Sequence, residues 1–150
     1  MTQRYDVHQV SPEAYQAMLA LGRQARNSGL EAGLIELVKV RISQINGCAF
    51  CLALHLDKAR KLKISETRLH LLAVWREAPV FSERERAALA FAECLNRLPE
   101  TGVADDLFAE ASRNFPLADV SALAFVVVEI GSWNRLMVAS RTPPLAENLL

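Results

Sequence analysis

Apolar residues recur along this chain at steps of three and four, the spacing that places side chains on one face of an α-helix. Leu34, Leu37, Val38 and Ile42 form one such face. Alternating runs of β-branched residues, which would indicate strands, are nearly absent. The pattern therefore predicts an all-α fold, a helical bundle of six or seven helices that forms a single domain over residues 1–150.

Helix boundaries are marked by residues that begin or stop helices. Ser82 with Glu85 forms a capping box, because each can bond the other's backbone N–H. Pro12 suits the first turn of a helix, and Asn46-Gly47 interrupts the apolar pattern. The expected helices cover about residues 12–25, 31 to the break at 46–47, 47–62, 65–75, 82–98, 104–113 and 117–139, and residues 141–150 are expected to form an extended tail.

The charge balance argues against several classes of partner. The chain has 17 basic and 17 acidic residues, a formal net charge of zero and a pI near 6.8. It therefore lacks the basic surface typical of proteins that bind nucleic acid or anionic membranes. Its longest unbroken apolar run near the C-terminus, residues 122–128, is far shorter than the ~20 residues that span a bilayer. Because the first residues are polar and no signal peptide follows, we expect a cytoplasmic protein.

Hydrophobic residues make up 51% of the chain, although aromatic residues make up only 7%. This composition is typical of helices rich in alanine and leucine. It also leaves apolar surface for a homo-oligomer to cover, and we expect a dimer, trimer or hexamer.

The candidate chemistry lies in one short segment that contains Cys48, Cys51 and His55. Steps of three and four return to the same helix face, so the two thiols and the imidazole would form a continuous stripe. Such a stripe suits a dithiol that cycles through a disulfide, or a metal site. In a reducing compartment a close cysteine pair is more typical of catalysis or metal binding than of a structural cross-link. The third cysteine, Cys94, falls on an apolar stripe and is predicted to be a small core residue.

The order of these residues assigns each a different task in a dithiol site. With Asn46 as the helix cap, both thiols would lie near a helix N-terminus, where negative charge is stabilised. His55 is nearer Cys51, so Cys51 is the candidate reactive thiolate and Cys48 is placed to close a disulfide with it. Glu36 is the candidate carboxylate to orient His55, provided that the two helices fold back on each other across residues 46–47.

These four residues carry a resemblance to a known family. Glu36, eleven further residues and then Cys48, Cys51 and His55 in the pattern Cys-x-x-Cys-x-x-x-His resemble the alkylhydroperoxidase D-like proteins of the carboxymuconolactone decarboxylase superfamily. The sequence segments at residues 36–47, 81–89 and 132–135 extend the similarity over about residues 30–138.

The resemblance implies an all-helical homo-oligomer with thiol peroxidase activity and no haem, flavin or other cofactor. Cys51 would react with a hydroperoxide substrate, Cys48 would resolve the product, and an external dithiol reductant would restore both thiols. His55 would take the Cys51 proton, and Glu36 would support this relay. The better-known members carry a histidine directly before the second cysteine, and this chain has Phe50 there.

Other interpretations of the same residues stay open at this point. Disulfide formation could serve a redox sensor or a disulfide-exchange module in place of peroxide turnover. Two thiolates, an imidazole and a carboxylate could also bind zinc, although four ligands within about 20 residues of helix converge poorly. Finally, Glu36 could be a surface carboxylate that pairs with Lys39, three residues further on.

Overall fold

The structure, a computed structural model that describes residues 2–146, is built from helices. Within that range it contains eight α-helices and one short 3₁₀ turn, with no strand. The predicted all-α fold is thus confirmed. The helices are α1 (Val7–Val10), α2 (Pro12–Arg26), α3 (Ala32–Asn46), α4 (Ala49–Lys61), α5 (Glu66–Leu71), η1 (Leu72–Val74), α6 (Glu83–Arg97), α7 (Asp105–Asn114) and α8 (Leu117–Ser140).

The helix count exceeds the expected six or seven because of α1. This helix has only four residues, too few to show an apolar period, and Asp6 caps it by accepting hydrogen bonds from the N–H groups of His8 and Gln9. The helix expected over residues 65–75 is shorter than predicted, because it tightens into η1 after Leu71. Of the tail expected at residues 141–150, residues 142–145 are not helical and residues 147–150 lie outside the described range.

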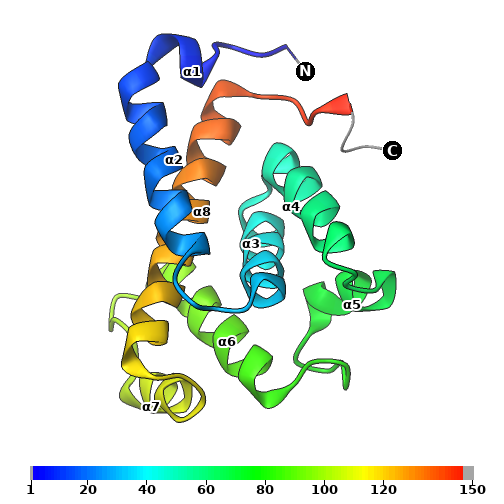
Figure 1. The fold of residues 1–150 in the computed structure, drawn as a ribbon, viewed down its shortest axis with the longest axis vertical. Coiled ribbons are helices and arrows are strands. Elements are labelled where there is room, and N and C mark those ends of the chain that lie inside the picture. Colours follow the sequence, from blue (N-terminus) through cyan, green and yellow to red (C-terminus); the bar gives the residue numbers. More distant parts are fainter. Residues whose placement is uncertain (1, 147–150) are drawn as a thin grey trace.

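Helix α3 occupies the centre of the bundle (Figure 1). It packs against α4 on one side and against α8 on the other, while α2 lies along α8 and α6 packs with α7. The central position explains why the apolar pattern of α3 is so dense. Leu37, Val38, Val40 and Ile42 are completely buried, and burial of each such side chain contributes roughly 1.5–3 kcal/mol.

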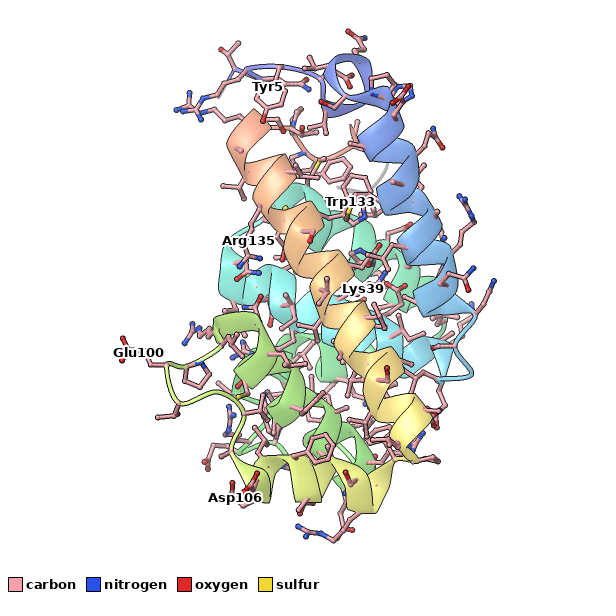
Figure 2. All side chains as sticks on the ribbon, turned by 90° about the vertical axis from the view of Figure 1, so that its left-hand side faces the viewer. Tyr5, Lys39, Glu100, Asp106, Trp133 and Arg135 are labelled. Carbon is pink, nitrogen blue, oxygen red and sulfur yellow. The ribbon has the colours of Figure 1, made fainter. Side chains whose placement is uncertain are left out.

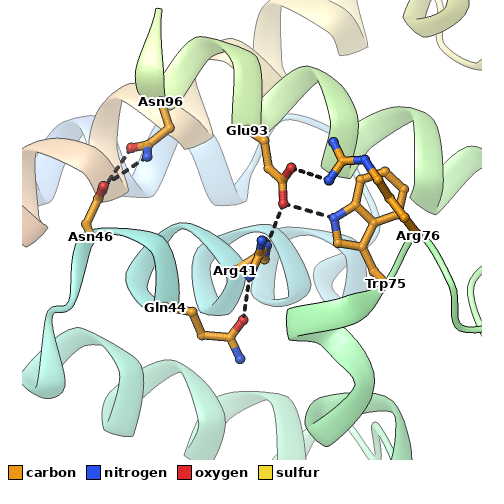
Figure 3. Close-up of polar contacts among 7 residues, drawn as sticks. All are labelled: Arg41, Gln44, Asn46, Trp75, Arg76, Glu93 and Asn96. Atoms are coloured by element: carbon orange, nitrogen blue, oxygen red, sulfur yellow. Dashed lines mark hydrogen bonds and ion pairs between the residues drawn. The ribbon is translucent and has the colours of Figure 1, made fainter.

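One partly buried carboxylate fixes α6 against α3 and the turn at η1 (Figure 3). Glu93 of α6 accepts hydrogen bonds from Arg41 at 2.6 Å, Trp75 at 2.9 Å and Arg76 at 2.7 Å. Burial opposes ionisation of Glu93, but these three donors outweigh it and lower the pKa of the carboxyl group. Because the bonds come from two segments, they hold the outer face of α3 in place. Cys94, the neighbour of Glu93, is only partly buried, at the edge of the core rather than within it.

Helix α8 is the one helix of residues 2–146 that is long and apolar enough to cross a membrane, with a mean hydropathy of 1.4 over an 18-residue window. About 44% of that window is buried inside the protein. Buried Glu129 and Asn134 interrupt it, and it packs against α2, α3 and α6. These contacts are typical of the core helix of a globular protein.

The connection between α3 and α4 depends on Gly47. This residue adopts the left-handed conformation, with φ 66° and ψ 30°, so that the N–H of Cys48 reaches the carbonyl of Ser43 at 3.1 Å. Left-handed backbone is freely open to glycine and strained for other residues. The chain therefore reverses direction here, and α4 returns along α3.

We predict that Gly47→Ala lowers the free energy of unfolding by about 1–2 kcal/mol, through backbone strain. No atom lies within 4 Å of the added methyl group, so crowding does not contribute. Gly33→Ala is the matched control, because Gly33 is helical and its added methyl would meet only Ile64 at 3.8 Å. Urea unfolding should show the control to be neutral or stabilised, and equal values for the two variants would contradict the role of Gly47.

Candidate active site

The residues predicted to carry the chemistry come together where α3 and α4 lie side by side. Cys48 immediately precedes α4, Cys51 and His55 lie on its first two turns, and Glu36 projects from α3. All four are buried, with exposed fractions of 2%, 2%, 5% and 6% in that order. The chain therefore reverses at Gly47, as the expected contact between Glu36 and His55 requires.

Cys48 itself caps α4, which differs from the expected cap at Asn46. Gly47 ends α3 one residue after Asn46, and Cys48 has extended backbone with φ −89° and ψ 98°. Its sulfur accepts a hydrogen bond from the backbone N–H of Cys51 at 3.3 Å. The sulfur thus takes the place that a serine or aspartate oxygen fills in other helices. The two sulfurs lie 2.7 Å apart, so the Cys51 thiol can donate a hydrogen bond to Cys48 once Cys48 is ionised.

These contacts give the two thiols opposite properties. The hydrogen bond from the Cys51 thiol, the N–H groups of Cys51 and Phe50, and the side chain of Asn134 lower the pKa of Cys48 to about 7, against the effect of burial. Donation to Cys48, together with burial, raises the pKa of Cys51 above its ordinary range. The first negative charge of the pair thus rests on Cys48, whereas the sequence indicated Cys51. Cys51 needs an external base to lose its proton.

His55 is a neutral imidazole, the form that can accept such a proton. Its Nδ1 lies 2.7 Å from Oε2 of Glu36. A carboxylate at this position selects the tautomer with the proton on Nδ1 and leaves Nε2 as an acceptor. Burial lowers the pKa of His55 below 6.5, although Glu36 partly opposes the shift. The imidazole is therefore neutral at neutral pH and able to take a proton.

Asn134 is a site residue whose contacts the sequence did not predict. It projects from α8 and is 1% exposed. Asn46 Nδ2 donates to its side-chain oxygen at 3.0 Å, which fixes the orientation of the amide, and Asn134 Nδ2 donates to Ser43 Oγ at 3.2 Å. The side chain of Asn134 also favours the thiolate forms of both cysteines, which helps to lower the pKa of Cys48 and partly opposes the rise in the pKa of Cys51. Asn96 holds Asn46 in turn, through reciprocal amide bonds of 2.8 and 2.9 Å (Figure 3).

A second polar group was likewise not predicted, a buried ion pair between Lys39 of α3 and Glu129 of α8. Lys39 Nζ lies 2.7 Å from Glu129 Oε2, and Trp133 Nε1 donates to Glu129 Oε1 at 3.1 Å. Figure 2 shows Lys39 and Trp133 in the region between α8 and α2. Gly22 of α2 makes room for this carboxylate, because a methyl group there would lie 2.6 Å from Oε1. Lys39 thus pairs with Glu129, and the alternative pairing of Glu36 with Lys39 does not form.

A cavity of about 140 Å³ adjoins the reactive groups. Cys51 and His55 form part of its wall. Cys48 is not among the described residues that line it. A small molecule in the cavity would therefore meet Cys51 before Cys48. The charged groups Lys39 and Glu129 also line it.

The arrangement suits a dithiol better than a bound metal. The ring nitrogen Nδ1 of His55 is already engaged with Glu36, and the two sulfurs face each other. No group of three or more histidine, cysteine, aspartate or glutamate residues in the described range is placed to hold a metal ion. The geometry therefore gives no set of ligands for the zinc alternative.

Comparison with known proteins agrees with the resemblance seen in the sequence. The model of the carboxymuconolactone decarboxylase family matches residues 12–93. An uncharacterized Bacillus subtilis protein, YdfG, is 32% identical over 139 residues, which are 93% of this chain and 95% of that protein.

Solved structures share the fold. A protein of unknown function from Agrobacterium tumefaciens, described as a candidate antioxidant defence protein AhpD, superposes with a TM-score of 0.93 at 36% identity, over 97% of this chain and 99% of that one. The debrominase Bmp8 in complex with 2,3,4-tribromopyrrole has a TM-score of 0.79 at 18% identity, over 93% of this chain and 74% of that one. At that identity the likeness shows the fold alone.

We predict that Asn134→Asp raises the pKa of the Cys48 thiol from about 7 toward the ordinary value of 9.0. The substitution keeps the shape of the side chain but replaces a donor with a negative charge beside the sulfurs. Iodoacetamide alkylation against pH, followed by peptide mapping of Cys48, measures this shift. Asn96→Asp, in the same amide network without a bond to either thiol, is the matched control. An unchanged midpoint for Asn134→Asp would rule out the stabilising contact.

Proposed function

The chain belongs to the carboxymuconolactone decarboxylase family, in its alkylhydroperoxidase D-like group, and from this premise we propose that it is a thiol-dependent peroxidase. It would reduce small hydroperoxides through a dithiol–disulfide cycle of Cys51 and Cys48. His55 and Glu36 would form the proton relay. An external dithiol would supply the electrons, and no metal or cofactor takes part.

The observation that carries this proposal is the pairing of two different thiols at 2.7 Å, one of them open to a cavity. Cys51 faces the cavity beside a neutral imidazole, and Cys48 lies behind it with a pKa of about 7. Reduction of a peroxide by two thiols requires these properties, an accessible nucleophile with a base and a second thiolate within bonding reach. The fold by itself does not select this activity, since a debrominase shares it.

In the first step the Cys51 sulfur attacks the terminal oxygen of ROOH. The sulfur–oxygen bond forms as the oxygen–oxygen bond breaks. The Cys51 proton passes to Nε2 of His55, and Glu36 stabilises the imidazolium ion through Nδ1. His55 then returns the proton to the departing alkoxide. The products are a sulfenic acid on Cys51 and the alcohol ROH.

In the second step the Cys48 thiolate attacks the sulfur of the Cys51 sulfenic acid. A disulfide forms, and hydroxide leaves and is protonated to water. The lowered pKa makes this thiolate available at neutral pH, although Phe50 stands where related proteins carry a histidine. The backbone N–H groups at the start of α4 and the side chain of Asn134 stabilise the Cys48 thiolate. A histidine at position 50 would otherwise help to form this thiolate. An external dithiol then reduces the disulfide by exchange and becomes oxidised itself.

We also propose that the protein acts as a homo-oligomer in the cytoplasm. The exposed side of α8 is apolar, since Leu117, Phe125 and Val128 are 70%, 53% and 54% exposed. A second copy of the chain covering this side would remove these side chains from water.

We predict that Cys51→Ser abolishes consumption of tert-butyl hydroperoxide, because no other thiol faces the cavity. Cys48→Ser should retain a single oxidation event and accumulate a sulfenic acid on Cys51. Peroxide consumption with dithiothreitol as donor measures the first effect, and dimedone labelling with peptide mapping measures the second. Cys94→Ser is the matched control and should turn over at the wild-type rate. Continued turnover by Cys51→Ser would reject the assignment.

We predict that His55→Gln slows sulfenic acid formation at pH 7 by about 10²–10⁴-fold, the usual contribution of a general base. Glu36→Gln should cause a smaller loss, because an amide can still bond His55 but no longer balances the imidazolium charge. Since the pKa of His55 is lowered, wild-type sulfenic acid formation should persist as the pH falls through 6.5. Disulfide closure should slow as the pH falls below 7, because Cys48 becomes protonated. Stopped-flow measurements from pH 5 to 8 separate the two steps, and equal rates for wild type and His55→Gln would contradict the relay.

A further inference from the structure

More cationic than anionic side chains line the cavity beside Cys51. Arg26 of α2, Lys39 of α3 and Lys58 of α4 all line it, together with the single carboxylate of Glu129. Lys39 and Glu129 neutralise each other at 2.7 Å. Two cationic side chains, Arg26 and Lys58, are left at the cavity from two different helices.

Within residues 2–146, neither of these cations has a hydrogen bond or an ion pair to the protein. Lys58 is partly buried, and burial lowers its pKa. Among the nearby charges, Glu36 opposes this shift most, Lys39 and Arg26 add to it, and Glu129 also opposes it. An anion bound here would offset the cost of burying the Lys58 charge, and it would also offset the repulsion of Lys58 by the neighbouring cations.

The remainder of the cavity is small and apolar. An apolar cavity of roughly 150 Å³ holds a molecule about the size of benzene, and this one has a volume of about 140 Å³. A ligand that fills it would have a compact hydrocarbon body with its charged group near Arg26 and Lys58. The apolar lining consists of Tyr15, Leu19, Phe50, Leu54, Trp133 and Met137.

We propose that this cavity selects small hydroperoxides that carry a carboxylate, which Arg26 and Lys58 bind while the peroxide group reaches Cys51. The inference rests on the proposed peroxidase function for the reaction itself. The anion site is independent of that reaction, because it concerns only which molecules reach the Cys51 sulfur. Arg26 and Lys58 are therefore specificity residues and take no part in proton transfer.

Two alkylating reagents test the anion site without any peroxide. Iodoacetate and iodoacetamide are similar in size and differ in charge, so the ratio of their rate constants at Cys51 measures the preference for an anion. We expect the iodoacetate-to-iodoacetamide ratio to fall by about threefold to tenfold in Arg26→Gln and in Lys58→Met, the scale expected for loss of one partly screened charge. Peptide mapping assigns the product to Cys51, and Cys94 in the same sample is the internal reference.

Arg23→Gln is the matched control, because Arg23 is exposed on the same helix and lies outside the cavity wall. Its ratio at Cys51 should equal that of the wild type. Lys58→Met keeps the apolar stem of the lysine, and the exposed position of Arg26 keeps the test valid if the Lys58 variant does not fold. A ratio at Cys51 that is the same in wild type and in Arg26→Gln would overturn the proposal.

A matched pair of substrates then tests the class of hydroperoxide. 3-Hydroperoxy-3-methylbutanoate and its methyl ester share one body and differ in charge. We expect wild type to have a kcat/KM at least about fivefold higher for the carboxylate, and Arg26→Gln to remove most of this preference. An equal kcat/KM for acid and ester in wild type would exclude the substrate class. If neither compound is consumed but the iodoacetate preference is found, the peroxidase function fails while the anion site stands.

Discussion

The 2.7 Å contact between His55 and Glu36 is the interaction on which the arrangement of this protein depends. It joins α4 to α3, and it can form only because the chain reverses at Gly47. The same reversal places Cys48 in extended backbone directly before α4, where its sulfur caps the helix. One glycine thus sets two features together, the imidazole beside Cys51 and the backbone donor for Cys48. The apolar face of α3 holds this hairpin at the centre of the bundle.

Much of the fold could be predicted because its signals are local. The capping box at Ser82 and Glu85 is present as expected, with bonds of 2.9 and 3.2 Å. Six of the seven longer helices lie close to their predicted ranges, since each has a marked end, whereas α5 stops early where the chain tightens into η1. Helix α1 and the cap at Cys48 were not predicted. A four-residue helix has no period, and a cysteine is not among the residues that usually cap helices.

The site divides in the same way into local and distant parts. Cys48, Cys51 and His55 follow from spacing along one helix, and Glu36 from a fixed offset on the helix before it. Asn134 reaches the thiols from 83 residues beyond Cys51, through packing of α8 on α3 that no local pattern encodes. The pair of Lys39 and Glu129 spans a similar distance. Glu129 and Asn134 are polar residues within a long apolar helix, and this was the available signal of their contacts. A buried polar group requires a partner.

The closeness of the two cysteines in sequence has a consequence for the oxidised protein. A bond between Cys48 and Cys51 would enclose a ring of only four residues. Loop entropy from so small a ring amounts to about 2 kcal/mol, compared with nearly 5 for a ring of 100 residues. The loop entropy of this disulfide would therefore raise the free energy of unfolding by only about 2 kcal/mol. Because a folded domain is usually stable by about 5–15 kcal/mol, the scaffold would stay folded in both oxidation states of the proposed dithiol cycle.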